Sequence, residues 1–256
     1  MFEIETIREV EEAAFHSWPA LHVAEVGGWR LRSARGVTGR GNSVCAILSD
    51  AGSVPERLEQ VEEFYRSDGL PPRFQITPAV LPSDLDALLE ARGYRFHSPT
   101  FVQHAPLSAV LERTPMLRSA PHFAAEVCED WDEEWFALYA QAEEMDGATA
   151  DVRAAILRQI APPVAFVRLD IHGSPAAVGL GVVRGRWMGI FCMSTHAAQR
   201  RQGAASAILR TLAIWAQMNE ATDAYLQVQQ RNAGALSVYA RAGFRTAYRY
   251  HYRILD

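Results

Sequence analysis

Two stretches of the sequence read alike and restrict the possible fold more than any other feature. Ala87–Phe96 reads ALLEARGYRF, and Val238–Thr246 reads VYARAGFRT. In each, apolar residues at helical spacing precede a glycine that ends the helix, and an aromatic residue, an arginine and a strand follow. The pattern before both stretches is also the same: strand, helix, strand, helix. We expect two related α/β halves, although such junctions between helix and strand are common in unrelated folds.

The chain is expected to divide into residues 1–107 and 122–256, joined by a linker at 108–121. Three prolines and no clear periodicity mark the segment around the linker, Pro106–Pro121, although Val110–Arg113 could form a helical turn. Apolar periodicity places helices in the first half at Ile4–Phe15, Pro55–Arg66 and Ser83–Arg92, and strands at Trp29–Ser33, Ser43–Ser49, Arg73–Thr77 and Tyr94–His104. The second half is expected to contain strands at Phe123–Val127, Val164–Ile171, Ala176–Arg184, Arg186–Thr195, Tyr225–Gln229 and Tyr248–Ile254, and helices at Trp131–Ala142, Ala204–Asn219 and Asn232–Ala242.

Composition narrows the class of protein. Hydrophobic residues make up 49% of the 256 residues, enough for a substantial core, and the net charge of −5 argues against nucleic-acid binding. There is no apolar run long enough to span a membrane, and the acidic N-terminus lacks the features of a secretory signal. Cys45, Cys128 and Cys192 are expected to be reduced thiols, and no histidine or cysteine spacing indicates a metal site. We therefore expect a cytoplasmic protein without a metal site.

The stretch Met193–Ser206, MSTHAAQRRQGAAS, carries the clearest chemical signal. A predicted strand ends there, and a short loop leads into a helix through Gly203, where small residues allow a ligand to approach the backbone. The free N–H groups and the dipole of a helix N-terminus bind phosphate, and Arg200 and Arg201 add positive charge. This pattern predicts a phosphate site that lacks the lysine of an ATP-binding loop.

A second motif follows at Asn232–Phe244, NAGALSVYARAGF. Asn232 and Tyr239 are separated by two helical turns and therefore share one face of the predicted helix. Tyr239 could face the ligand bound by the preceding loop, or it could be a core aromatic residue.

Together the two motifs resemble those of the GNAT superfamily of acyl-CoA N-acyltransferases. Arg200, Gly203 and Ala205 match its Arg/Gln-x-x-Gly-x-Gly/Ala motif, and the Asn232–Phe244 motif matches the second. The resemblance covers about residues 120–256 and implies a catalytic domain there. Residues 1–107 look like a degenerate copy without a phosphate motif. The implied fold class is α/β, with two tandem GNAT-like domains, each a mixed twisted sheet flanked by helices.

The resemblance also implies roles for individual residues. Tyr239 would protonate the leaving thiolate, and backbone donors near Met193 would stabilise the oxyanion. Asn232 would contact the cofactor arm or fix the last helix. The residues implied to bind acetyl-CoA are Met193, Thr195, Arg200, Arg201, Gln202, Gly203, Ala204, Ala205, Ser206 and Asn232. The predicted strands beside the site contain no carboxylate, so the general base stays open among Glu143, Glu144, Asp146, His196 and water, with Glu144 as the assigned candidate.

The expected function is transfer of an acetyl group from acetyl-CoA to a primary amine of a small molecule, amino-acid derivative or peptide, by a monomer or homodimer. Two alternatives stay open: a tandem acyltransferase with a larger acyl donor, and a non-catalytic acyl-CoA sensor. The first half is expected to serve acceptor binding or solubility. Ten acidic residues between Glu126 and Val152 suggest a cationic acceptor, or simply a solvated surface.

Overall fold

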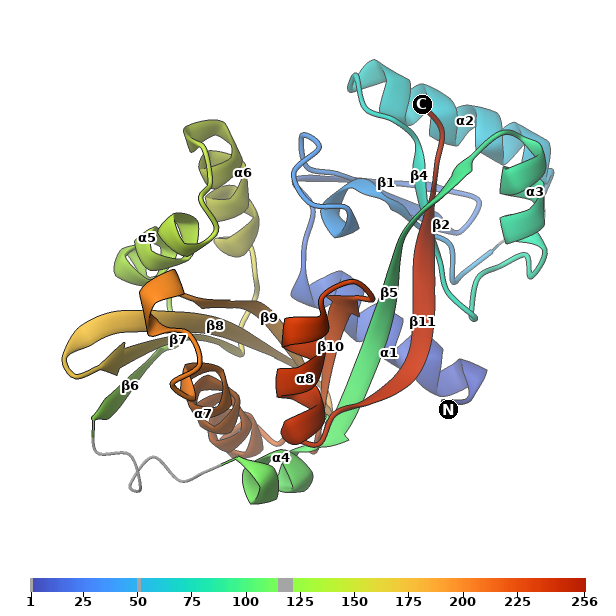
Figure 1. Cartoon of the computed structure of the whole chain (residues 1–256). Helices are drawn as coiled ribbons and strands as arrows, with labels where there is room; N and C mark the ends of the chain where they lie inside the picture. The colour runs from blue at the N-terminus through green and yellow to red at the C-terminus, as the bar shows by residue number, and fades with distance from the viewer. Residues whose placement is uncertain (1, 50–51, 115–121) are drawn as a thin grey trace.

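A computed structural model describes residues 2–49, 52–114 and 122–256. Its strands form one continuous mixed sheet of eleven strands in the order β1-β2-β3-β4-β11-β5-β10-β9-β8-β7-β6. Helices flank the sheet on both faces (Figure 1). The α/β fold with a twisted mixed sheet and flanking helices is thereby confirmed.

The first half of the chain supplies one end of this sheet. Its helices are α1 (Ile4–Ser17), α2 (Val54–Ser67) and α3 (Leu85–Ala91), and its strands are β1 (His22–Val26), β2 (Trp29–Ser33), β3 (Val44–Cys45), β4 (Arg73–Ile76) and β5 (Arg95–Pro106). Trp29, Phe74 and Tyr94 are fully or almost fully buried between the sheet and α2 and α3, so this end has its own apolar core.

The second half supplies the other end. Its helices are α4 (Leu107–Arg113), α5 (Glu133–Ala142), α6 (Gly147–Leu157), α7 (Ala204–Met218) and α8 (Ala233–Arg241), and its strands are β6 (Phe123–Cys128), β7 (Val164–Ile171), β8 (Ser174–Arg184), β9 (Trp187–Thr195), β10 (Asp223–Gln229) and β11 (Arg245–Ile254). Alternate residues of β7 and β8 point to opposite faces. One face packs with α1, α5 and α6, and the other packs with α4 and α7.

The two halves exchange strands at the centre of the sheet. Strand β5 of the first half pairs antiparallel with β10, and β11 of the second half pairs antiparallel with β4. Strands β5 and β11 also pair with each other along most of their length. The two similar junctions identified in the sequence precede these two strands: Gly93 and Gly243 both have positive φ, as the end of a helix often requires. A division of the chain at 108–121 stays a prediction, and the strands of the two halves interleave across it.

Most predicted elements are confirmed, with several corrections. Strand β1 and helix α6 were not predicted, because β1 is a mostly exposed or half-exposed edge strand and α6 begins with the small residues GATA. Only Val44–Cys45 of the strand predicted at Ser43–Ser49 pairs with neighbours. The helix predicted at Ser83–Arg92 begins two residues later, at Leu85, and Asp84 is its N-cap. The first part of the predicted linker is helix α4, and residues 115–121 lie outside the described residues.

Candidate active site

An opening between two parallel strands defines the site. Strands β9 and β10 pair in parallel from Trp187 with Asp223 to Ile190 with Leu226, and their pairing ends there. Beyond this point β9 continues along β8, and β10 continues along β5. Each strand therefore presents an edge toward the gap between them. A ligand with amide groups can bind such an edge as an added strand does.

A bulge in β9 lies at the mouth of this opening. Val178 faces Ser194 and Leu180 faces Phe191, so two residues of β9, Cys192 and Met193, oppose one residue of β8. Cys192 has a φ of 50°. A bulge leaves an extra residue outside the regular ladder and redirects side chains and backbone groups. Both residues of the bulge line the cavity, and the family resemblance implies oxyanion donors near Met193.

The predicted phosphate loop lies at the N-terminus of α7. Gly203 is the N-cap residue and has a φ of 92°, a left-handed conformation that glycine adopts without strain. No side chain of a described residue caps this helix. Its first N–H groups therefore stay available for an anion. Arg200 and Arg201 are exposed beside it, and the Arg200 Nε donates to the Thr195 carbonyl oxygen at 3.3 Å.

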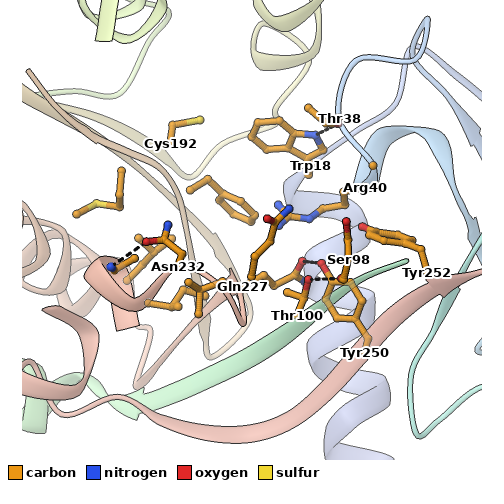
Figure 2. Close-up of a pocket in the computed structure, with 18 of the residues that line it drawn as sticks. Trp18, Thr38, Arg40, Ser98, Thr100, Cys192, Gln227, Asn232, Tyr250 and Tyr252 are labelled. Carbon is orange, nitrogen blue, oxygen red and sulfur yellow. Dashed lines mark hydrogen bonds between the residues drawn. The ribbon is translucent and has the colours of Figure 1, made fainter. Parts of the chain in front are cut away.

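Both halves of the chain line the cavity that extends from the opening. Its volume is about 640 Å³. Strands β9 and β10 and helix α8 form one wall, and β5, β11 and the loop before Asn42 form the other. Figure 2 shows Cys192 and Asn232 on one side of this space and Arg40, Ser98 and Tyr252 on the other. The first half is therefore part of the site itself.

Helix α8 brings Asn232 and Tyr239 to the cavity wall. The Asn232 Oδ1 accepts a 3.1 Å hydrogen bond from the Ala235 N–H and caps the helix. Two roles were implied for Asn232, and the structure shows one of them, the capping of helix α8. Burial raises the pKa of Tyr239 to about 12. Its hydroxyl therefore keeps its proton at neutral pH and can serve as an acid.

One carboxylate reaches the cavity from α5. Glu143 lines the cavity, and its Oε1 accepts a 2.8 Å hydrogen bond from the Ser194 Oγ on β9. Its neighbour Glu144, the base assigned from the sequence, is exposed and lies outside the lining. The geometry therefore favours Glu143 over Glu144. The Glu143 carboxylate comes from the end of helix α5, which packs across β9. The sequences of the strands beside the site therefore give no sign of it.

Cys192 is held as a neutral thiol. Burial raises the pKa of Cys192 to about 11, although a hydrogen bond with Tyr139 opposes this effect. The Tyr139 hydroxyl also accepts a 2.7 Å hydrogen bond from Arg153. A thiol with this pKa is a poor nucleophile at neutral pH. This argues against a covalent acyl-cysteine intermediate.

The other predicted positions lie on different surfaces. Met193 lines the cavity, whereas Thr195 lies at the end of β9 outside it, and Gln202–Ser206 occupy the start of α7. The acidic residues after Glu126 mostly lie elsewhere: Glu126 and Glu134 pair with Arg168, for example. Glu143 is the one member of that group among the described lining residues. Of the two interpretations of this acidic stretch, its positions favour the solvated surface.

The loop Gly36–Gly41 is held in place by one buried side chain. The Asn42 side chain accepts hydrogen bonds from the Ala34 and Gly36 N–H groups and donates to the Val37 and Thr38 carbonyls, at 2.7–2.9 Å. The loop is thereby held against the cavity, and Arg40 at its end lines it. No local pattern in the sequence indicates this role.

An opened pair of parallel strands beside an uncapped helix N-terminus is the arrangement of a GNAT-type acyltransferase. Residues 5–253 match the family model described as the C-terminal part of the probable histone acetyltransferase Rv0428c. The chain belongs to this family, within the GNAT superfamily. The resemblance seen in residues 120–256 thus extends through nearly the whole chain.

Relatives of known sequence agree with this assignment. The uncharacterized N-acetyltransferase YobR of Bacillus subtilis is 30% identical over 257 aligned residues, which cover 98% of this chain and 99% of YobR. The probable histone acetyltransferase Rv0428c of Mycobacterium tuberculosis is 26% identical, over 93% of this chain and 70% of its own. These relatives support acyl transfer as the general activity.

Solved structures share the fold. A GCN5-related N-acetyltransferase from Kribbella flavida superposes with a TM-score of 0.66 at 17% identity, over 98% of this chain and 94% of its own. A tandem GNAT protein from the clavulanic acid biosynthesis pathway gives a TM-score of 0.60 at 14% identity, over 81% and 72% of the two chains.

Further features of the described residues bear on the class of enzyme. None of the helices within the described ranges combines the length and apolarity needed to cross a membrane. No group of three or more His, Cys, Asp or Glu side chains in this part of the chain is placed to hold a metal ion.

Proposed function

We propose that this protein is an N-acetyltransferase that uses acetyl-CoA as donor and a primary amine of a small molecule, amino-acid derivative or peptide as acceptor. Two observations carry the proposal: the opening between β9 and β10, and the helix α7 that follows β9 in the chain and whose N-terminus has no side-chain cap. This combination offers strand edges for an amide-containing arm and free N–H groups for a diphosphate.

The residues present fit such a donor. The N–H groups at the start of α7 would hold the diphosphate, and the left-handed Gly203 lets the chain turn there without a side chain in the way. The edge of β9 at Met193 would bind the pantetheine arm. When bound, acetyl-CoA supplies an acetyl group activated as a thioester.

Residues of the cavity would then carry the proton transfers. Glu143 would take a proton from the acceptor ammonium or amine, directly or through water, so that the nitrogen lone pair can attack the thioester carbonyl carbon. Backbone N–H groups of the β9 bulge would stabilise the resulting oxyanion. As the carbon–sulfur bond breaks, the Tyr239 hydroxyl would donate its proton to the departing sulfur. The high pKa of the Cys192 thiol favours this direct attack over a route through an acyl-enzyme.

The alternative of a non-catalytic acyl-CoA sensor rested on the absence of a carboxylate in the predicted strands. Glu143 on α5 supplies one within the cavity, which favours an enzyme. No contact of the described residues favours a larger acyl donor, and we retain acetyl-CoA.

Two measurements test the proposal. Isothermal titration calorimetry with acetyl-CoA tests binding, and release of the free CoA thiol in the presence of a panel of amines tests turnover. We expect binding together with thiol release that depends on the amine. Binding without amine-dependent release would instead establish a sensor, and absence of binding would refute the proposed function.

A further inference from the structure

The acceptor part of the cavity is rich in arginine. Four arginines and a single carboxylate, Glu143, are among its described lining residues: Arg40, Arg73, Arg153 and Arg231. Arg40 lies at the end of the loop held by Asn42, and Arg73 begins strand β4. Both therefore belong to the first half of the chain, whereas the α7 phosphate loop belongs to the second half. Their charge is therefore placed away from the expected diphosphate site.

Two of these arginines form no ion pair with a described residue, although the charge of Arg40 opposes the rise that burial causes in the pKa of Glu11. Arg40 and Arg73 form no hydrogen bond or ion pair through their side chains with any described residue, and the Nε of each is buried. In contrast, Arg30 and Arg92 elsewhere in the same half pair with Glu12 and Glu62. Arg40 and Arg73 both line the cavity, and their guanidinium groups have no hydrogen-bond acceptor among the described residues, so an anionic ligand can supply one there.

Arg40 lies next to the reacting position. Its Cζ is 5.0 Å from the centre of the Phe191 ring on β9 and 5.6 Å from that of Trp18, and Figure 2 shows it pointing into the cavity between the two halves, near Gln227. Phe191 immediately precedes the bulge. The Gln227 Nε2, another buried donor without a partner among the described residues, also lines this space.

The Arg73 side chain lies beside the loop residue that precedes Arg40. A Cβ built on Gly39, the residue before Arg40, would lie 3.3 Å from a terminal guanidinium nitrogen of Arg73. The positive charge at this end of the cavity acts on its neighbours: burial, and then Arg73, Arg95 and Arg231, lower the pKa of His97. Two guanidinium groups and an amide donor thus line one cavity, whose described lining residues include a single carboxylate, Glu143.

We propose that the acceptor amine carries an anionic group, a carboxylate or a phosphate, and that Arg40 and Arg73 bind this anion while Glu143 faces the amine. Planar guanidinium groups bind both anions through paired hydrogen bonds. The aromatic rings of Trp18, Tyr250 and Tyr252 in the lining suit an apolar body between the two ends. This inference rests on the proposed acyl transfer and specifies its substrate class as a small amino acid or aminoalkyl phosphate.

Matched acceptors test the inference. Rates of thiol release would be compared for phenylalanine and phenylalaninamide, and for phosphoethanolamine and ethanolamine, so that the two pairs distinguish carboxylate from phosphate. Because hydrogen bonds to charged groups contribute about 1.5–3 kcal/mol, we expect the preferred anionic member to exceed its neutral partner by at least ~10-fold in kcat/KM. The inference is wrong if both neutral acceptors are used as well as their anionic counterparts or better. Turnover of these neutral acceptors would still support the proposed acyl transfer.

Substitutions of Arg40 and Arg73 test whether these residues cause the preference for an anionic acceptor. Arg40→Gln and Arg73→Gln should each lower kcat/KM for the anionic acceptor more than for its neutral partner and thereby remove most of that preference. Arg40→Lys, which retains the charge, should recover part of it. Arg35→Gln is the control, because Arg35 is exposed on the same loop and outside the cavity lining. A preference that persists in both glutamine variants refutes the assignment.

A binding measurement separates this inference from turnover and from donor binding. Calorimetry with N-acetylphenylalanine, its amide and inorganic phosphate should show that the wild-type protein binds an anion, and that Arg40→Gln weakens this binding with acetyl-CoA affinity unchanged. If the variants lose acetyl-CoA affinity instead, the arginines serve the donor and the inference fails. If no probe distinguishes the variants from the wild type, it fails as well. Thermal melting of each variant reports any loss of fold.

Discussion

The Ser194 Oγ donates a 2.8 Å hydrogen bond to the Glu143 Oε1 and thereby joins strand β9 to the end of helix α5. The bond orients a carboxylate beside the bulge of β9, where the site is expected to hold a thioester carbonyl. Two adjacent glutamates at this helix end thus have different surroundings, since Glu143 lines the cavity and Glu144 does not.

Exchange of these two glutamates for glutamine tests which one acts. Loss of a general base typically lowers the rate by ~100-fold or more, so Glu143→Gln should lower kcat by this order with acetyl-CoA affinity unchanged. Glu144→Gln is a control matched in sequence and chemistry and should have wild-type kinetics. Steady-state rates of thiol release and calorimetry measure both quantities. The opposite result would restore Glu144 as the base, and no effect from either would assign the role to water.

The Tyr239 hydroxyl should matter only while the sulfur departs. Tyr239→Phe is therefore expected to lower kcat and kcat/KM together, by roughly 10-fold or more, with little change in acetyl-CoA affinity. Because the raised pKa of Tyr239 is about 12, its acid form persists until the pH approaches that value, and the wild-type rate should show no alkaline decline from this group up to about pH 10. An unaltered rate in Tyr239→Phe would make the residue a packing element.

A side chain at Gly203 should weaken donor binding. The residue has a φ of 92°, so Gly203→Val would strain the loop and obstruct the approach of a phosphate to the helix N-terminus. We expect the Kd for acetyl-CoA to rise at least ~10-fold, or about 1.4 kcal/mol. Gly173→Val is the matched control, because Gly173 has a φ of 72° in the open turn between β7 and β8. Equal affinity in the two variants would exclude the α7 N-terminus as the phosphate site.

The neutral thiol of Cys192 should not form an intermediate. Since its pKa is raised to about 11, little thiolate is present near pH 7, and mass spectrometry of the enzyme with acetyl-CoA alone should find no acetyl group on this residue. Cys192→Ala should retain kcat within a few fold, roughly the effect of a small change in packing. Acetylated Cys192 that transfers its acetyl group to added amine would contradict direct attack.

The exchanged strands predict that neither half functions alone. A fragment of residues 120–256 lacks β5, which lies between β10 and β11 and supplies part of the cavity wall. We expect this fragment to show no thiol release and to lack the cooperative thermal unfolding of the full chain, and fragment 1–107 to bind no acetyl-CoA. Co-expression of both fragments serves as a control for strand pairing in trans. A fully active 120–256 fragment would contradict this account of the site.

The sequence predicts the two helix starts at Gly203 and Asn232 far better than the packing that brings Arg40 and Glu143 into one cavity. Gly203 and Asn232 belong to local motifs, in which a strand, a turn and a helix end lie within a few residues of one another, so spacing alone reports their geometry. Arg40 and Glu143 come from a loop and a helix distant in the chain. Their positions in the cavity depend on tertiary packing, which the periodicity of apolar residues in the sequence does not indicate.

The strand order illustrates the same limit. The repeated junctions before β5 and β11 correctly predict two similar halves of helix and strand. Alternation of apolar residues shows that a segment is a strand, but the identity of its neighbours depends on contacts across the whole chain. Pairing of β5 with β10 and of β11 with β4 therefore could not be read from either half.

The place of β11 also concerns the synthesis of the protein. This strand consists of Arg245–Ile254 and is made long after β4 and β5, yet it completes their pairing. Domains that fold as units during translation can do so as soon as their own segment has emerged. Here the first half must wait for a strand of the second half, so the edges of β4 and β5 stay open to wrong partners until β11 has been made.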